Sequence, residues 1–293
     1  MSVTFSALVL VLASSLAWCG LDLARKLLAD RIRPMPLAVL ICMAAVPIFA
    51  VWMMIDGVPV VRSSYWLPAL GSVALNIGAN LGFFAALRGG ALSVTIPLLS
   101  LTPVFTTLLA IPMLGQQPSA LQGGGILLVV LGVFALNLPA DGPLSPAAAW
   151  RAWRGERSAL LMVLVALLWS MTVPLDKIAM ESASGPLHGL VLNAGVGGAV
   201  ALIILAQGRL RELADVRQVP LLFTVGVVVS VVALGLQLLA LQQVWVGLVE
   251  SLKRGIGNAM ALILGYLVFR EPITARKLAA VGLMAFGVVL ILS

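Results

Sequence analysis

The sequence predicts an all-α integral membrane protein with about ten transmembrane helices. Of its 293 residues, 61% are hydrophobic and only 10% are charged, and the mean hydropathy is +1.13. A soluble domain of this length needs more charge to solvate its surface. The apolar residues also form separate blocks of about 20 residues, the length of helix that crosses a bilayer core of ~30 Å.

The apolar blocks define the expected spans. Each block is apolar on all sides, whereas the strands of a membrane barrel alternate apolar and polar residues, so helices are predicted. The expected spans cover residues 3–25, 36–55, 66–87, 91–114, 119–138, 159–180, 187–206, 219–241, 244–268 and 273–292.

Basic residues are concentrated in the loops on one side of these spans. The loops after the odd-numbered spans carry fourteen Lys and Arg residues, whereas the opposite side has only Arg62 and Lys177. The positive-inside rule predicts that the fourteen-residue side is cytoplasmic and that both termini are external. The basic loop residues that set the membrane orientation therefore explain the net charge of +7, and a nucleic-acid partner is not expected. We expect a multi-pass protein of the plasma (inner) membrane.

Two short patterns occur twice along the chain. One is a tryptophan followed eight residues later by a lysine, and the other is a Gln-Pro or Glu-Pro pair at the end of a span. The matching residues are Trp18 and Lys26 with Trp169 and Lys177, and Gln117-Pro118 with Glu271-Pro272. Each repeat would have five spans. Because five is an odd number, the two repeats would enter the membrane from opposite sides, and such inverted repeats are typical of transporters. We expect a first repeat over residues 1–138, a cytoplasmic linker over 139–158 and a second repeat over 159–293, arranged around a central cavity.

The repeated Trp-x7-Lys pattern and the Glu-Pro-x-Thr sequence from Glu271 to Thr274 resemble EamA-type members of the drug/metabolite transporter superfamily. The resemblance covers essentially the whole chain. It implies ten helices in two inverted five-helix repeats, a central cavity and alternating access. It implies no particular substrate, because the family carries amino acids, sugars, nucleotide derivatives and other metabolites. It also implies cytoplasmic termini, whereas the loop charges of this chain predict external ones.

The ninth span carries the clearest candidate binding site. Glu250 precedes Lys253 and Arg254 by three and four residues, so the three side chains share one helical face. Lys253 lies roughly 13 Å into the membrane at 1.5 Å per residue. An ionisable residue at such depth costs about 2.5–3.5 kcal/mol on insertion scales. One carboxylate against two cations leaves a net positive charge, so we predict that Lys253 and Arg254 bind an anionic group; a purely structural ion pair is the alternative.

The adjacent Lys253 and Arg254 also resemble the Lys-Arg pair that holds the substrate phosphate in plastid-type triose-phosphate/phosphate translocators. Those proteins have a further lysine in the fourth span, four residues before a proline. Here that position is Leu99, before Pro103. The departure favours a singly charged phosphate, sulfonate or carboxylate over a doubly charged phosphate held from both halves.

Further polar and aromatic residues are weaker candidates. Trp18 and Trp169 are repeat mates that either face the substrate or pack between helices. Asn76 and Asn80 stand one turn apart on the third span and either line the cavity or bond neighbouring helices.

Charged residues near the span ends are candidates for gating or coupling. Asp22 and Lys177 are the two proposed for this role, although Asp22 and Asp176 would also serve to neutralise nearby cations. Glu250 is an alternative proton carrier. The chain's single histidine, His188, lies near a span end and is predicted to be an interface residue.

The sequence indicates a transporter rather than an enzyme. It has no metal-ligand spacing, no phosphate-binding glycine loop and no catalytic Ser/His/Asp set, so no cofactor is expected. The leading hypothesis is a secondary transporter of a small polar organic metabolite, with an anionic substrate favoured and a proton or an exchanged anion as coupling partner. A flippase for a phosphate-bearing lipid or lipid-linked headgroup is the alternative, and an intramembrane enzyme the third reading. The expected partners are the substrate and membrane lipid.

Overall fold

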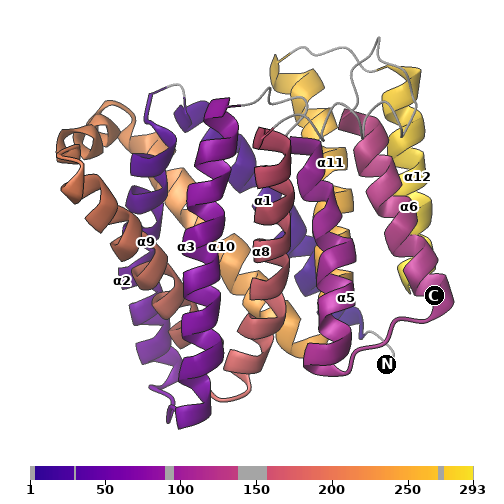
Figure 1. Ribbon diagram of the computed structural model, residues 1–293, viewed down its shortest axis with the longest axis horizontal. Helices are drawn as coiled ribbons and strands as arrows, with labels where there is room; N and C mark the ends of the chain where they lie inside the picture. Colours follow the sequence, from indigo (N-terminus) through magenta and orange to yellow (C-terminus); the bar gives the residue numbers. More distant parts are fainter. Residues whose placement is uncertain (1–3, 30, 90–95, 138–156, 270–273, 293) are drawn as a thin grey trace. The chain divides into compact units, whose positions relative to one another are not determined.

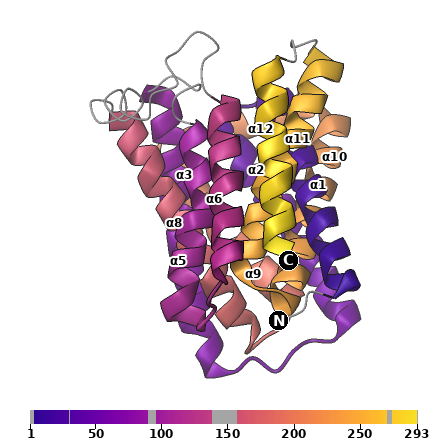
Figure 2. The same ribbon diagram turned by 90° about the vertical axis from the view of Figure 1, so that its right-hand side faces the viewer.

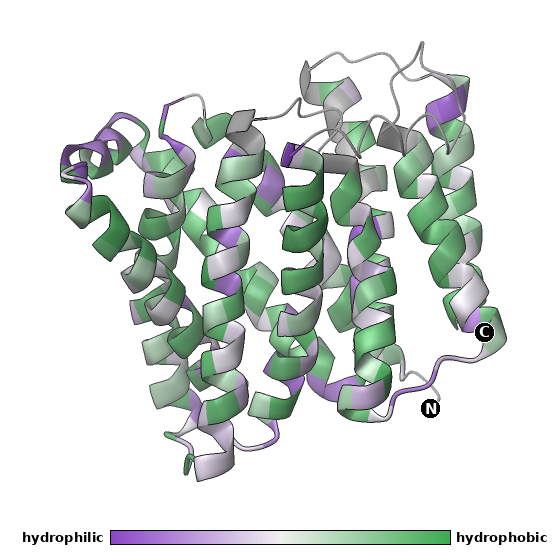
Figure 3. Ribbon diagram, viewed as in Figure 1, coloured by the Kyte–Doolittle hydropathy of each residue, from purple (hydrophilic) through white to green (hydrophobic). Residues whose placement is uncertain are grey.

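The protein is all-α, as predicted, throughout the residues that its computed structural model describes, namely 4–29, 31–89, 96–137, 157–269 and 274–292. Residues 139–156 of the expected linker, and Glu271 and Pro272 of the repeated pattern, lie outside this part of the chain. Figure 3 shows that hydrophobic residues cover most of the length of the helices.

Seven stretches of the described residues are helical, long and apolar enough to cross a membrane. They are α1 (Phe5–Ala29), α2 (Pro34–Asp56), Ser63–Ala86, α8 (Arg157–Met180), α9 (Gly185–Ala206), α10 (Pro220–Gln243) and α12 (Ala275–Leu292). Two shorter apolar helical stretches are Leu98–Leu114 and Ala120–Ala135. The chain is therefore a multi-pass membrane protein.

The chain divides into two compact units, each assembled from distant parts of the sequence. Unit 1 comprises residues 1–77 and 175–244, and unit 2 comprises residues 78–174 and 245–293. Both units thus contain segments from each of the two expected repeats. Because the units are defined by contacts and not by sequence similarity, the repeat boundaries stay a prediction.

Unit 1 is built on two helix pairs. It contains α1, α2, the 3₁₀ helices η1 (Ser63–Tyr65) and η3 (Leu210–Gln218), the first part of α3 (Trp66–Gly89), the end of α8, and α9 and α10. Helix α1 packs along α10 and α2 packs along α9, as Figure 1 shows for α2 and α9. Gly189 lets α9 approach α2 closely, because a Cβ at this position would lie 2.4 Å from the Phe49 ring.

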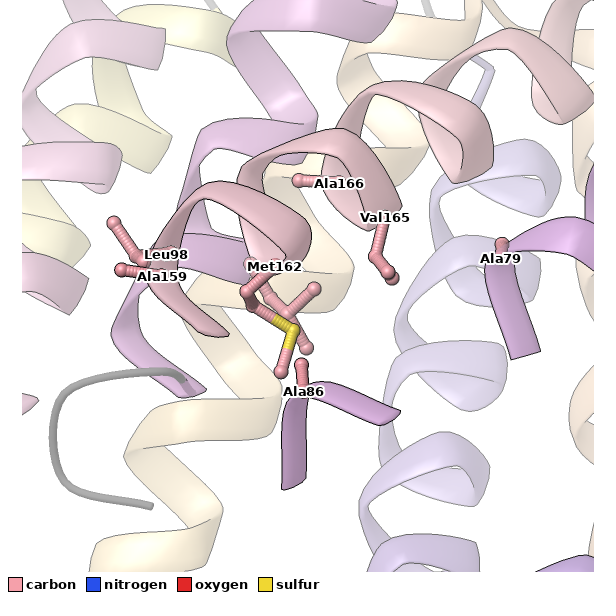
Figure 4. Close-up of a cluster of buried hydrophobic side chains, with 8 residues drawn as sticks. Ala79, Ala86, Leu98, Ala159, Met162, Val165 and Ala166 are labelled. Atoms are coloured by element: carbon pink, nitrogen blue, oxygen red, sulfur yellow. The ribbon is translucent and has the colours of Figure 1, made fainter. Parts of the chain in front are cut away.

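Unit 2 holds the remaining helices around an apolar cluster. It contains the second part of α3, η2 (Ile96–Leu101), α5 (Thr102–Leu114), α6 (Ala120–Asn137), most of α8, α11 (Val246–Phe269) and α12. The cluster joins small residues of α3, such as Ala79 and Ala86, to Met162 and Val165 of α8 and to Leu98 of η2. Figure 4 shows Met162 directed toward Ala86. Small residues on one helix thus accommodate large ones on its neighbour.

Helices α6 and α12 are in backbone contact within unit 2. Figures 1 and 2 both show the two helices side by side. A Cβ at Gly125 of α6 would lie 2.6 Å from the carbonyl oxygen of Gly287 on α12. A Cβ at Gly132 would lie 2.8 Å from the carbonyl oxygen of Ala280. The close approach therefore depends on glycine at these positions.

We expect Gly125→Ala to destabilise the protein by about 1–3 kcal/mol, because the new methyl group meets the backbone of α12 and cannot be accommodated by a side-chain rotation. Gly124→Ala is the matched control, since a Cβ there has no atom within 4 Å. Thermal unfolding of both variants in detergent tests this: a midpoint that falls for Gly124→Ala but not for Gly125→Ala would contradict the packing described.

Candidate functional site

The predicted charged residues of the ninth span lie together on α11 in unit 2. Glu250 is only 2% exposed, and its carboxylate accepts a hydrogen bond from Nζ of Lys253, one helical turn further along. The pair therefore neutralises a carboxylate that would otherwise be buried unpaired at high cost. This contact is the one expected from residues three apart on a helix.

Arg254 is hydrogen-bonded to the first residue of α5. Its Nε donates a hydrogen bond of 3.0 Å to Oγ1 of Thr102, a residue that is 1% exposed. The Thr102 hydroxyl in turn donates to the carbonyl oxygen of Leu99 at 2.8 Å. Ser170 of α8 donates to the carbonyl oxygen of Thr102 at 3.2 Å. The guanidinium is thus positioned by neutral hydrogen-bonding groups on α5, η2 and α8.

Thr102 and Ser170 were not identified from the sequence. Thr102 is 152 residues from Arg254, and a hydroxyl residue in an apolar span is common, so no local pattern indicates this contact. Leu99, at the position of the translocator lysine, is buried in the apolar cluster of unit 2. The Leu99 side chain thus packs in the apolar cluster, and only its carbonyl oxygen is linked, through Thr102, to Arg254.

The two other candidates in unit 2 are Trp169 and Asn80. Trp169 is half-buried, packs against the apolar cluster and lies 5.5 Å from the Phe83 ring, centroid to centroid. Asn80 is half-buried on α3. Trp169 thus has a packing role, and a substrate contact for it or for Asn80 stays a prediction.

The remaining candidates belong to unit 1. On α1, Asp22 is 71% exposed at its side chain and lies 3.7 Å from Arg25, whose guanidinium carbon is 5.9 Å from the Trp18 ring centroid. Asp22 thus has the neutralising partner that the sequence suggested, and a gating role for Asp22 stays a prediction. Asn76 on α3 donates to the backbone carbonyl of Ser72 at 3.2 Å.

Lys177 has a contact that accounts for its unusual position. Its Nζ donates a 2.6 Å hydrogen bond to the carbonyl oxygen of Val244, the residue directly after α10. A cation at the C-terminus of a helix interacts favourably with the helix dipole. Lys177 therefore joins the end of α8 to the end of α10, and a coupling role for it stays a prediction.

A buried polar network in unit 1 was missed. His188 was predicted to be an interface residue, and this is wrong, because its side chain is 0% exposed. Its Nε2 lies 3.0 Å from Oδ1 of Asp176, and its Nδ1 lies 3.2 Å from the Tyr65 hydroxyl. Ser72 donates a hydrogen bond to Asp176. The signal was an aspartate and a histidine in consecutive apolar spans separated by a short turn.

A second charged cluster lies outside the seven candidate spans. Arg209 forms two hydrogen bonds with the carboxylate of Glu212 in η3, at 2.9 and 2.8 Å, and Arg33 bonds the same carboxylate. The hydrogen bond from Arg209 and the charges of both arginines lower the pKa of Glu212. This cluster joins the chain before α2 to the segment between α9 and α10. Among the described residues, no three His, Cys, Asp or Glu side chains are grouped so as to hold a metal ion.

These features define a multi-pass helical membrane protein with charged and polar groups buried among its spans. Comparison with known families supplies the class: the EamA-like transporter family matches residues 5–138 and 157–293. The chain therefore belongs to the EamA-like transporter family, which confirms the resemblance to EamA-type members and indicates a membrane transporter. The further likeness to triose-phosphate translocators stays a prediction.

The fold is shared with a solved structure, described only as the crystal structure of a protein. The TM-score is 0.76 at 16% sequence identity, over 97% of this chain and 96% of the other. At this identity the likeness concerns the fold alone. None of the curated proteins matches the chain significantly.

We expect Thr102→Val to destabilise the protein by about 1–3 kcal/mol, because the isosteric valine removes the acceptor for Arg254 Nε in a buried site. Thr102→Ser keeps the hydroxyl and should recover most of the loss. Thermal unfolding in detergent measures both variants. Destabilisation by serine but not by valine would show that the methyl group of Thr102, and not its hydrogen bond, is what matters.

Proposed function

We propose that the protein is a secondary transporter that moves a small polar organic metabolite by alternating access, and that Lys253 and Arg254 bind an anionic group of this metabolite. The observation that carries the proposal is the charge balance of α11. This helix has one carboxylate and two cations within five consecutive residues, and the carboxylate is almost completely buried.

The described contacts of α11 include one ion pair and one hydrogen bond to a neutral group. Glu250 offsets the charge of Lys253, whereas the contact between Arg254 and Thr102 is with a neutral hydroxyl and offsets no charge. One of the N–H donors of the Arg254 guanidinium, that on Nε, binds Thr102. Arginine binds carboxylates, sulfonates and phosphates through paired parallel hydrogen bonds. We therefore assign Arg254 the principal contact with the anion and Lys253 the second.

The packing within each unit supports ten spans in two inverted repeats. The proposed repeats pair α2 with α9, α5 with α11 and α6 with α12 as equivalent helices. Each of these pairs packs together, the first in unit 1 and the other two in unit 2. Contacts between equivalent helices are those that lie next to a pseudo-two-fold axis, and such axes relate inverted repeats in transporters.

The membrane orientation follows from the loop charges. We propose external termini in the plasma (inner) membrane, because fourteen basic residues lie on one side of the expected spans and two on the other. The chain carries no nucleotide-binding motif, which supports transport driven by an ion gradient or by exchange rather than by ATP.

The proposed anion site predicts selective stabilisation by one class of metabolite. In a thermal-shift screen of the purified protein, singly charged phosphates, sulfonates or carboxylates should raise the unfolding temperature, since a ligand at 100 times its Kd stabilises by about 2.7 kcal/mol. Cationic and neutral metabolites should not. We expect Arg254→Gln and Lys253→Met each to weaken the effect about tenfold or more in ligand concentration.

Lys277→Met is the matched control, because Lys277 lies in the first turn of α12 and not on α11. The ligand-induced shift is compared within each variant, since Lys253→Met also leaves Glu250 without its partner and lowers the starting stability. Stabilisation that is unchanged in both α11 variants would refute the proposed site. Stabilisation by lipid-linked headgroups but not by free anions would favour a flippase.

A further inference from the structure

The buried network of unit 1 joins four elements through ionisable and hydroxyl side chains. Asp176 lies near the end of α8, His188 lies in the first turn of α9, and Tyr65 and Ser72 come from η1 and α3. All four are less than 5% exposed. Apolar side chains surround them, including Ala69, Ala179 and Leu187. The network is therefore a polar site inside an apolar region of a membrane protein.

The geometry accommodates both protonation states of the histidine. When the imidazole is neutral, Nε2–H donates to the Asp176 carboxylate and Nδ1 accepts from the Tyr65 hydroxyl. When the imidazole is charged, Nδ1–H donates to the same hydroxyl, because a tyrosine hydroxyl both donates and accepts. When a proton from outside the pair is added to Nδ1, rotation of the Tyr65 hydroxyl keeps the contact between Tyr65 and His188 and reverses the direction of its hydrogen bond.

Opposing interactions act on the charged forms. The Asp176 carboxylate favours the imidazolium, and a protonated histidine makes the buried pair neutral. The first turn of α9 disfavours the imidazolium, since the N-terminus of a helix carries partial positive charge. Without the extra proton, the carboxylate is still stabilised by the hydrogen bonds from Ser72 and His188.

Other charged groups on the packed elements are few and lie at their ends. In the described part of unit 1 they are Lys177 and Glu181 beside Asp176 on the α8–α9 segment, Arg62 before η1, and Asp56 at the end of α2. Lys177 donates a hydrogen bond to the Val244 carbonyl, and the other three side chains are exposed. The elements α3, α9 and α10 carry no further charged residue within this unit. The proton is therefore held mainly by Asp176 and His188 themselves.

We propose that Asp176 and His188 form a proton-binding site, and that the proton bound there couples a proton gradient to transport. The second clause rests on the proposed transport function, whereas proton binding does not. Proton binding changes the charge of a pair that bridges α8, α9 and α3. A proton gradient therefore acts on the packing of helices that belong to the membrane-spanning part of the chain.

The chain's single histidine makes the first test unambiguous. Full-length protein labelled with ¹⁵N-histidine is placed in lipid nanodiscs, and the imidazole ¹⁵N signals are followed over the pH range in which the protein stays folded. We expect one reversible change between the neutral and the doubly protonated imidazole. Signals that stay in one form over the whole range would overturn the proposal, because the network would then be only structural.

Two variants separate the pair from its surroundings. Asp176→Asn should weaken the proton affinity of His188 about tenfold or more, because the opposite charge next to the imidazole is lost. Glu181→Gln, which removes an exposed carboxylate five residues along the chain, should leave the titration unchanged. An equal change in both variants would overturn the assignment to Asp176.

A transport experiment tests the coupling. In liposomes loaded with an anion identified by the thermal-shift screen, a pH gradient should drive uptake by the wild type and not by Asp176→Asn, while exchange of labelled for unlabelled anion continues in both. Gradient-driven uptake by Asp176→Asn would overturn the coupling. Absence of any anion binding or exchange, with the histidine titration intact, would refute the proposed function and still support the proton site.

Discussion

The charged site on α11 depends on the ion pair between Glu250 and Lys253. A helix of 24 residues that is otherwise apolar can hold three ionised side chains among its neighbours only if they are neutralised or hydrogen-bonded. Glu250 supplies the neutralisation, and Thr102 supplies a hydrogen bond to Arg254. The pair thus allows α11 to keep one net positive charge where an apolar helix alone would exclude it.

The same constraint shapes both buried polar sites. In each, a hydroxyl residue on a neighbouring helix completes the hydrogen bonding of a charged or ionisable group: Thr102 serves Arg254 in unit 2, and Ser72 serves Asp176 in unit 1. Neutral hydroxyls satisfy such groups without cancelling their charge. The first site keeps a charge that can attract an anion, and the second keeps a pair that can take up a proton. At these two sites, neutral hydroxyls therefore provide hydrogen bonds to buried charged groups.

Local sequence patterns predicted the helices and the contacts within one helix. Hydropathy blocks indicated the membrane helices, and the three-residue spacing placed Glu250 beside Lys253. The contacts between helices were not predictable, because periodicity shows which residues share a face and not which helix that face meets. Thr102 was missed for this reason, and His188 was wrongly placed at an interface although it contacts Tyr65, 123 positions away. A polar residue near a span end can equally be buried when the next helix returns across it.

We propose that α11 attracts an anion through its net positive charge. The most direct test is the equilibrium binding of a radiolabelled anion, chosen from the thermal-shift screen, to the wild type and to Glu250→Gln in nanodiscs. The substitution raises the net charge of the site from one to two and leaves Lys253 in place. The account predicts severalfold tighter binding by the variant, because an opposing charge is removed near the ligand. Unchanged or weaker binding would contradict it and would mean that the cations of α11 serve only to pair with Glu250.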